Sequence, residues 1–391
     1  MEASAANLPL SRPRPGARVL TAPARVNLIG EHTDYTGGLV MPMAIPFTTV
    51  AQLQSADDGR YTFSSELFSS SRSMTPDDRS PRMGDWSDYP VGVLRELEQR
   101  GINIPPFALH LSGNIPLGSG LSSSASVEVA TAIALLDHAR TMLPAEVIAK
   151  LCQRAENIYV GSPCGIMDQF VVTAAKAEHA LLLNTRDLQY ELLPMNKGEL
   201  ADCRIVVANS GVKHSIAGGD YGVRRREVEA GQAKLRERFP ELRDLGDATL
   251  EQLAACEREL TQQSLRRCRH IISENARVRE AAEAMVAGDA VRLGAVMTRA
   301  HASERDDFEC SIEEIDFLVQ TAIGLRGCHG ARLTGGGFGG CTVNLVDAAE
   351  VDGFTSGLGA AYHEGFALHL ETYVCAAVDG ALARNRVEEA R

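Results

Sequence analysis

The sequence lacks the features that mark exported, membrane-spanning and nucleic-acid-binding proteins. No apolar run is long enough to span a membrane, and residues 1–18 contain arginines and prolines instead of the apolar core of a signal peptide. The formal net charge of −12 opposes binding to nucleic acids and anionic membranes, which both require a basic surface. These absences predict a cytoplasmic protein that binds neither nucleic acid nor membrane.

Paired cysteines and the commonest motifs of nucleotide and acyl chemistry are absent as well. The nine cysteines stand singly, with no C-x-x-C pair and no cysteine–histidine cluster at zinc spacing, so we expect reduced thiols, most of them in the core. The chain has no P-loop, no H-R-D or D-F-G of a protein kinase and no G-x-S-x-G elbow of a hydrolase. Any nucleotide chemistry must therefore use another scaffold.

The composition is that of a globular protein with ample apolar side chains. Of the 391 residues, 45% are apolar and 23% are charged. This length exceeds one ordinary core, so we expect two domains, residues 1–205 and residues 206–391. The polar, proline- and serine-rich residues 69–85 predict an exposed loop.

The pattern of apolar residues predicts helices and strands in alternation. Apolar side chains three and four residues apart predict helices over 89–99, 124–136, 145–158, 165–176, 222–238, 250–287 with one or two breaks, and 311–325. Short apolar runs predict strands over 19–22, 26–29, 39–50, 107–111, 180–184, 204–208, 331–334 and 341–346, with a turn at Pro23. Ser311 followed by Glu314 indicates a capping box at the start of the last helix.

The most informative segment, residues 116–126, is rich in glycine and serine and stands between a strand-like and a helix-like run. Gly118 and Gly120 let the backbone bend without a Cβ clash, and the serines follow where a helix leaves its first N–H groups unpaired. The hydroxyls of residues 122–124 can donate to a phosphate, or give one oxygen to a magnesium ion. The alternative is an ordinary turn with a serine N-cap.

A second segment gathers polar side chains around a glycine. Within ten residues it contains Arg25, Asn27, Glu31, His32 and Asp34. Such density suits a ligand with many hydroxyl groups, because each hydroxyl taken from water needs a donor or acceptor. The segment therefore predicts a sugar site, and the alternative is a polar turn whose carboxylates are merely solvated.

Further candidates follow from their position in the predicted elements. Asp168 lies in the first turn of a predicted helix, where the helix dipole favours its ionised form, so it can orient or deprotonate an attacking hydroxyl, or only cap the helix. Glu156 can be a second magnesium ligand or a surface residue. Trp86 and Tyr89 can stack on a flat ring or serve as packing residues.

Residues 335–340 formally match the G-x-G-x-x-G motif of dinucleotide-binding folds. That motif requires a helix after its glycines, whereas Cys341 begins a strand-like run. We therefore expect a glycine-rich hairpin whose backbone approaches another group closely, such as phosphates held by the glycine- and serine-rich segment.

Together these segments resemble the GHMP kinases, which phosphorylate small molecules. The shared motifs are residues 25–35, 116–126 and 335–340, and residues 26–35 and 164–170 are similar to galactokinases in particular. The resemblance runs from about residue 22 to the C-terminus. It implies a two-domain α+β GHMP kinase fold, with an N-terminal ribosomal-protein-S5-like domain, a C-terminal ferredoxin-like domain and the active site in the cleft between them.

The resemblance also implies an activity and residue roles. The activity would be ATP-dependent phosphorylation of the anomeric C1 hydroxyl of galactose by a magnesium-dependent monomer, with Asp168 as base or orienting carboxylate and Arg25 stabilising the transition state. The sugar would contact Arg25, Glu31, His32, Thr33, Asp34, Gly165, Asp168 and Tyr221. ATP would contact Ser65, Trp86, Tyr89, Gly118, Ser119, Gly120, Leu121, Ser122, Ser123 and Ser124, and Mg²⁺ would bind Ser124 and Glu156.

Two other functions fit much of the same pattern. One is a kinase for N-acetylgalactosamine or another sugar with a C1 hydroxyl. The other is a non-catalytic sensor of galactose and ATP. Such relatives lose residues of the glycine- and serine-rich segment (called the serine loop below), but this chain keeps residues 122–125 as well as Asp168.

Two departures from the family pattern stand out. Ala24 replaces the usual glycine before Arg25, which predicts a slight shift of that arginine. The short stretch before the motif predicts a shortened or missing N-terminal helix.

Overall fold

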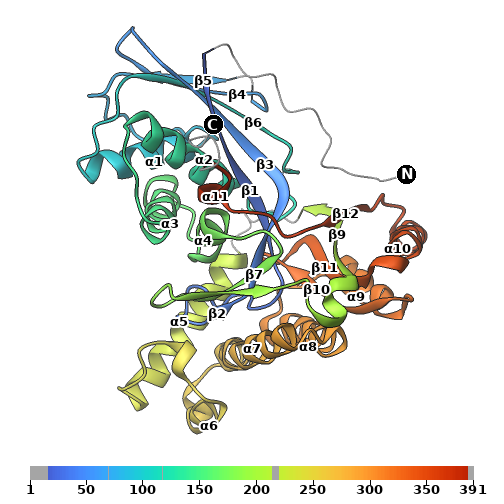
Figure 1. Cartoon of the computed structure of the whole chain (residues 1–391). Helices are drawn as coiled ribbons and strands as arrows, with labels where there is room; N and C mark the ends of the chain where they lie inside the picture. The colour runs from blue at the N-terminus through green and yellow to red at the C-terminus, as the bar shows by residue number, and fades with distance from the viewer. Residues whose placement is uncertain (1–15, 69, 117, 214–219, 386–391) are drawn as a thin grey trace.

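Three β-sheets and the helices around them make up the part of the chain that the computed structural model describes, residues 16–68, 70–116, 118–213 and 220–385 (Figure 1). Some sequence-based expectations concern residues 1–15, 69 and 117, which lie outside the described residues. These belong to the N-terminal stretch, the polar loop and the glycine- and serine-rich segment.

The first sheet has the strand order β1-β3-β6-β4-β5. β1 is a single strand at the edge of this sheet, so the predicted turn at Pro23 is wrong. The pairing of β1 with β3 instead shifts register between Pro23 and Ala24, because proline cannot donate to the ladder and is accommodated at a bulge. The strands are β1 (Arg18–Asn27), β3 (Pro42–Ser55), β6 (Phe107–Gly113), β4 (Tyr61–Ser65) and β5 (Ser71–Met74).

Strand β5 corrects the prediction that residues 69–85 form an exposed loop. It pairs antiparallel with β4, and Arg72 and Met74 are buried whereas Ser71 and Ser73 are exposed. The prediction failed because a charged residue such as Arg72 is not expected in a buried position. Its burial depends on a tertiary contact, since Arg72 donates to the carboxylate of Asp88 at 3.0 Å. Residues 75–86 contain no helix or strand.

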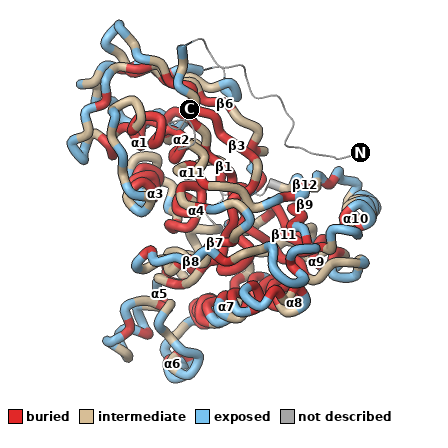
Figure 2. The backbone as a smooth tube through the Cα atoms, in the orientation of Figure 1, coloured by how far each residue is buried: buried red, intermediate tan, exposed pale blue. Residues whose placement is uncertain are grey.

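Five helices share one hydrophobic core with the first sheet. Helix α2 is apolar on all sides and is buried along almost its whole length between the sheet and its neighbouring helices (Figure 2). The predicted helix over 145–158 is confirmed as α3 and the π-helical turn that follows it. The bounds are α1 (Asp88–Gln99), α2 (Ser123–His138), α3 (Ala145–Arg154), the π-helix Ala155–Val160, α4 (Met167–Ala174) and α11 (Ala381–Asn385).

The second sheet has the strand order β10-β11-β9-β12, and a third, smaller sheet has the order β2-β7-β8. β10 and β11 form the expected hairpin around residues 335–340, which confirms that these glycines do not precede a helix. The strands are β10 (Cys328–Thr334), β11 (Gly339–Asp347), β9 (Cys203–Lys213), β12 (Glu371–Cys375), β2 (Leu39–Val40), β7 (His179–Asn184) and β8 (Tyr190–Pro194).

The helices of the second half confirm part of the prediction and correct the rest. The predicted helix over 250–287 with one or two breaks is confirmed as α6 and α7, whereas α8 and α10 were not predicted. The capping box is wrong, because α9 begins after Ile312 and the Ser311 hydroxyl donates to Asp316 at 2.6 Å instead. The bounds are α5 (Asp220–Arg238), α6 (Leu250–Ala255), α7 (Gln262–Ala287), α8 (Ala290–Ser303), α9 (Glu313–Gly324) and α10 (Val351–Phe366).

One hydrophobic cluster joins the two halves of the chain. It packs Leu28 and Met43 of the first half against Val207, Val296 and Leu345 of the second. The boundary expected near residue 205 falls in β9 and stays a prediction.

Within the described ranges, no helix has both the length and the apolar character that crossing a membrane requires.

Candidate active site

Two cavities adjoin at the start of helix α2. The larger, of about 280 Å³, is lined by the polar segment, the glycine- and serine-rich loop, the start of α4 and the tip of the β10–β11 hairpin. The smaller, of about 160 Å³, is lined mainly by apolar and aromatic side chains. Ser123 and Ser124 line both cavities, so a ligand can extend from one into the other past the helix N-terminus.

The glycine- and serine-rich loop has the geometry of an anion site. Gly118 and Gly120 have φ of 70° and 77°, and Ser122 is also left-handed at 59°. The N-cap Ser122 makes no side-chain cap, because its hydroxyl donates to the carboxylate of Asp168 instead. The first N–H groups of α2 therefore keep their hydrogen-bonding capacity at the wall of the cavity.

Arg25 and Asp168, 143 residues apart in sequence, form a two-pronged ion pair in the larger cavity. Nε and Nη2 of Arg25 donate to the two carboxylate oxygens at 2.6 Å each, and Nη1 donates to the carbonyl oxygen of Gly120 at 2.6 Å. Burial by itself lowers the pKa of Arg25, but the carboxylate of Asp168 outweighs burial and the net pKa is raised. The arginine is therefore charged and held in register with both the loop and the acid.

Glu31, His32 and Asp34 all line the larger cavity. Burial raises the pKa of Glu31 to about 7 and, together with the charge of Asp168, the pKa of Asp34 to about 6. His32 stacks on Phe308 with ring centroids 4.0 Å apart, and its Nε2 has no hydrogen-bond partner. Burial also lowers the pKa of His32 well below its usual range, so its imidazole is neutral.

Thr33 is the one residue of the predicted sugar site that does not line this cavity. Its hydroxyl contacts the carbonyl oxygens of Gly30 at 2.9 Å and Leu39 at 2.7 Å. The side chain therefore holds the turn that presents its neighbours, and sequence reasoning could not separate this role from ligand contact.

Gly165 and Tyr221 also line the larger cavity, next to the polar segment. A Cβ on Gly165 would lie 1.8 Å from Oδ2 of Asp34, so only glycine lets this carboxylate reach its place. Tyr221, from α5, lies beside His32 with ring centroids 5.7 Å apart.

Glu156 lies behind the serine loop as part of a buried carboxylate pair. Gln169 Nε2 donates to Glu156 at 2.8 Å and to Glu128 at 3.1 Å, and Oε1 of Glu128 has no partner. Burial and the charge of Asp168 raise the pKa of Glu156 to about 7, and burial and the charge of Glu156 raise the pKa of Glu128 well above its usual range. Sequence reasoning missed Glu128, although it is the one charged residue in the apolar stretch 125–136 of α2.

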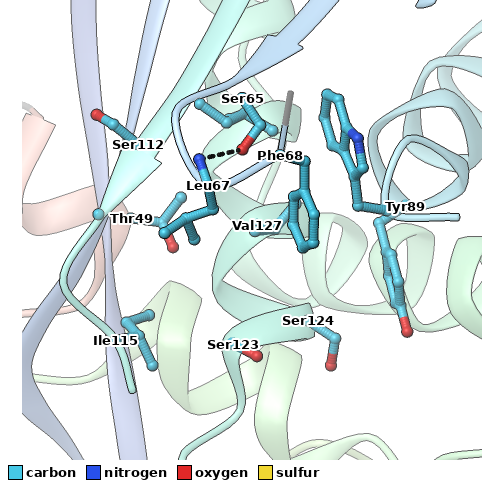
Figure 3. A pocket seen from close by; sticks show the side chains of 13 residues that line it. Thr49, Ser65, Leu67, Phe68, Tyr89, Ser112, Ile115, Ser123, Ser124 and Val127 are labelled. Atoms are coloured by element: carbon cyan, nitrogen blue, oxygen red, sulfur yellow. Dashed lines mark hydrogen bonds between the residues drawn. The ribbon is translucent and has the colours of Figure 1, made fainter. Parts of the chain in front are cut away.

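The smaller cavity carries the predicted aromatic pair and two residues that were not predicted. Trp86 stacks parallel to Phe68 with centroids 5.9 Å apart, and Tyr89, Ser65 and Leu67 also line the cavity. Figure 3 shows Leu67 and Phe68 on one side of this space and Ser123 and Ser124 on another. Leu67 and Phe68 are 53% and 40% exposed. They form an apolar surface on which a flat ring can pack.

The tip of the β10–β11 hairpin contacts the glycine- and serine-rich loop directly. A Cβ on Gly335 would lie 3.2 Å from the carbonyl oxygen of Gly120, and one on Gly340 would lie 3.2 Å from that of Ser119. The Gly335 N–H donates to Glu31 at 2.8 Å. The close approach expected of this hairpin is therefore made to the backbone of the loop, and Gly335 reaches the wall of the larger cavity as well.

Comparison with known families assigns this arrangement to a class. The model of the GHMP kinases N terminal domain matches residues 88–176, and that of the GHMP kinases C terminal matches residues 281–364. The crystal structure of Methanococcus jannaschii mevalonate kinase shares the fold, with a TM-score of 0.67 at 19% identity over 94% of this chain and all of that one. The fold is that of a GHMP kinase, as the sequence motifs predicted.

Closer relatives narrow the class. The galactokinase galactose-binding signature matches residues 11–55. The chain is 41% identical to a galactokinase of Roseiflexus sp. (strain RS-1) over 93% of this chain and 92% of that protein, and 42% identical to one of Streptomyces coelicolor over 88% of each. The crystal structure of Lactococcus lactis galactokinase complexed with galactose superposes with a TM-score of 0.90 at 33% identity over 94% of this chain and 95% of that one. The chain belongs to the galactokinase family.

Proposed function

We propose that the protein transfers the γ-phosphoryl group of ATP to the anomeric C1 hydroxyl of galactose, giving galactose 1-phosphate and ADP. The observation that carries this proposal is the Arg25–Asp168 pair, which stands between the polar segment and the serine loop. A carboxylate for the acceptor hydroxyl and a cation for the transferred group are thus fixed at the same point of the cavity.

ATP is proposed to extend across both cavities. The adenine would lie between the apolar and aromatic side chains that include Trp86, Tyr89 and Phe68, close to Ser65. The phosphates would meet the N–H groups of residues 118–124 at the N-terminus of α2, where the helix dipole favours negative charge.

Galactose is proposed to occupy the part of the larger cavity lined by Glu31, His32 and Asp34. Each offers a hydrogen-bonding atom to a sugar hydroxyl, and the unpartnered Nε2 of His32 is the clearest case, because a buried nitrogen without a partner carries a free-energy penalty that a ligand would remove. Gly165 and Tyr221 would close the pocket around the ring.

Ser124 and Glu156 would hold a magnesium ion, and their surroundings fit one. Glu156 and Glu128 share a buried region whose carboxyl groups are hard to ionise, and Glu128 keeps an unpartnered oxygen, so a cation would favour the ionised forms. When bound, Mg²⁺ neutralises phosphate charge in phosphoryl transfer.

The chain's own groups would act on the acceptor and the transferred phosphoryl. Asp168 would orient the C1 hydroxyl and accept its proton as the new bond forms, after exchanging its contact with Ser122 for one with the sugar. Arg25 would stabilise the charge on the phosphoryl oxygens in the loose transition state.

We further propose that the protein is a cytoplasmic monomer. One chain supplies every wall of the described cavities, which supports a monomer, and the nine cysteines are unpaired thiols, which supports a reducing compartment.

A coupled ADP-release assay tests the proposal. We expect turnover with galactose far above that with its C4 epimer glucose or with N-acetylgalactosamine, and a fall in kcat of ~10²–10⁴-fold for Asp168→Asn, because general-base assistance is lost. The matched control is Asp57→Asn, an exposed carboxylate on the same half of the chain. Near-normal turnover of Asp168→Asn would refute the assigned role, and binding of galactose and ATP without any ADP release would favour a sensor.

A further inference from the structure

Three side chains able to bind metal meet at the end of the second sheet that is remote from the active site. Cys203 begins β9, Asp347 ends β11 and His329 stands near the start of β10, and one ligand atom from each lies within 4.8 Å of the other two. The three strands are neighbours in the sheet (Figure 1). The tip of the β10–β11 hairpin that contacts the serine loop is at the opposite end, ~20 Å away by strand rise.

The sheet places these side chains together by specific pairing. Cys203 and Asp347 are direct partners in the antiparallel register of β9 and β11, so their side chains leave the same face. His329 is the extra residue of a bulge, because Cys328 pairs with Val346 and Gly330 with the adjacent Leu345. A bulge turns a side chain away from the regular alternation, and here it brings the imidazole to the carboxylate.

Close packing fixes the backbone of His329. A Cβ on Gly294 of α8 would lie 2.1 Å from the His329 carbonyl oxygen, and one on Gly330 would lie 2.0 Å from the carbonyl oxygen of Gly294. Helix α8 and strand β10 are therefore in contact through Gly294 and through Gly330, the residue after the histidine. The cluster rests on a rigid support, as a preformed metal site requires.

We propose that Cys203, His329 and Asp347 bind one transition-metal dication of the zinc type, with the fourth position taken by water. Thiolate and imidazole donors favour Zn²⁺ or Co²⁺ over Mg²⁺, and three protein ligands with one open position is a common zinc arrangement. The thiol of Cys203 would give its proton to solvent as the metal–sulfur bond forms, while the imidazole binds neutral and the carboxylate ionised.

The distances suit such a site after a small adjustment. His329 Nε2 and Asp347 Oδ1 are 2.6 Å apart in a direct hydrogen bond, and Cys203 Sγ is 3.9 Å from the same oxygen. Bonds of ~2.0–2.3 Å in a tetrahedron separate ligand atoms by roughly 3.3–3.8 Å, so the histidine and carboxylate would move apart by less than ~1.5 Å.

The surroundings favour a cation and give it access. Glu199 and Asp202 face Cys203 in addition to Asp347, against the single guanidinium of Arg204. Cys203 also lines a cavity of about 370 Å³, through which solvent can approach this side of the cluster. A hydrogen bond between His329 and Asp347 requires neither the additional carboxylates nor the cavity.

Cobalt titration of the full chain tests the site without reference to kinase activity. The protein is stripped with chelator and kept in excess Mg²⁺, which fills the nucleotide-site metal position, and Co²⁺ is then added. We expect a thiolate-to-cobalt charge-transfer band that saturates at one equivalent and is displaced by Zn²⁺. Cys203→Ser should abolish the band, whereas Cys328→Ser, which removes a partly exposed thiol next to His329 but outside the cluster, should keep it.

A second variant covers the case in which Cys203→Ser does not fold. His329 is at the rim, with 19% of its side chain exposed, so His329→Gln should fold and keep galactose turnover while weakening Co²⁺ binding by at least ~10-fold. No charge-transfer band in the unaltered chain, an equal band in Cys203→Ser, or unchanged affinity in His329→Gln would each overturn the proposal and leave only an ion pair beside a thiol.

Discussion

Arg25 and Asp168 show how one pair of side chains can link two parts of a reaction site. The guanidinium uses three hydrogen bonds, two to the carboxylate and one to the carbonyl oxygen of Gly120. Its position therefore depends on the acid and on the loop together. A lysine has the charge but cannot make this forked contact, because its ammonium is a single point of attachment.

Substitution of Arg25 separates its roles in binding and in the transition state. We expect Arg25→Ala to lower kcat by ~10²–10³-fold with a much smaller rise in KM for galactose, because charge on the transferred group develops only in the transition state. Arg25→Lys should recover part of kcat. Steady-state kinetics with both substrates measure this, and an effect confined to KM would make Arg25 a ground-state binding residue.

Asp34 gives the unliganded protein a pH-dependent stability. Burial and the charge of Asp168 raise its pKa to about 6, so the folded protein holds this proton more tightly than the unfolded chain. The stability contributed by the protonated carboxyl is complete below the unfolded pKa of ~4 and is lost as pH rises through about 6. The buried carboxylate is tolerated because galactose would supply it with donors.

The stability of Asp34→Asn relative to the unaltered chain should therefore depend on pH. Its free energy of unfolding, measured in urea without galactose, should rise relative to that of the unaltered chain by ~1–1.5 kcal/mol between pH 5 and pH 8. Asp57→Asn, at an exposed site, should show a flat difference. A difference for Asp34→Asn that is constant or shrinks with pH would contradict burial as the cause.

At the scale of elements, the β10–β11 hairpin supports the glycine- and serine-rich loop. Gly335 and Gly340 lie against the carbonyl oxygens of Gly120 and Ser119, and both have positive φ. The two loops, more than 200 residues apart in sequence, are in close contact, and the thiol of Cys341 donates to the carbonyl oxygen of Ser119 at 3.0 Å. Side chains at these positions would separate them.

Gly335→Ala and Gly211→Ala distinguish this contact from simple backbone strain. Both glycines have left-handed φ, 93° and 72°, but a Cβ on Gly211 would meet nothing within 4 Å. Each substitution should lower stability by ~1–2 kcal/mol, and only Gly335→Ala should raise KM for ATP, by ~10-fold, because the loop is displaced. Equal KM values for the two variants would show that the hairpin does not position the loop.

At the scale of the molecule, a buried ionic cluster ties the two halves of the chain together. Nη2 of Arg332, in β10, lies within 4 Å of three carboxylates. It is 2.6 Å from Oε1 of Glu304, 3.8 Å from Oε1 of Glu31 and 3.9 Å from Oε1 of Glu274. Glu31 belongs to the polar segment of the first half, and the others to the second. Loss of the one arginine would leave these carboxylates without their shared cation.

Arg332→Met should therefore destabilise both halves at once. We expect a loss of ~3–5 kcal/mol, seen in urea both by circular dichroism and by fluorescence of Trp86, the single tryptophan, which lies in the first half. Arg326→Met is the control, since its side chain is 87% exposed and its ion pair with Glu350 should contribute less than ~1 kcal/mol. An unchanged Trp86 transition in Arg332→Met would mean that the halves unfold independently.

Much of the site was accessible from sequence because its motifs are local. The serine loop, the polar segment and Asp168 were all predicted, and the structure brings them to the walls of one cavity. The errors lie where tertiary contact replaced local preference: a proline tolerated at an edge-strand bulge, a polar strand buried by one ion pair, and a serine that bonds to Asp316 instead of capping its helix. Glu128, Leu67 and Phe68 were missed because their role depends on neighbours distant in the chain.

The sequence by itself determined which chemical groups the protein possesses and in which short segments they stand, because glycine bends, helix starts and clusters of polar residues are local properties. Only the tertiary structure decided which groups meet. It joined Arg25 to Asp168 across 143 residues, placed Asp34 in the space that Gly165 leaves, and gathered Cys203, His329 and Asp347 from three strands whose spacing in sequence indicates no metal site. The reason is physical: burial and distance set pKa, charge pairing and ligand geometry, and packing between distant elements fixes both.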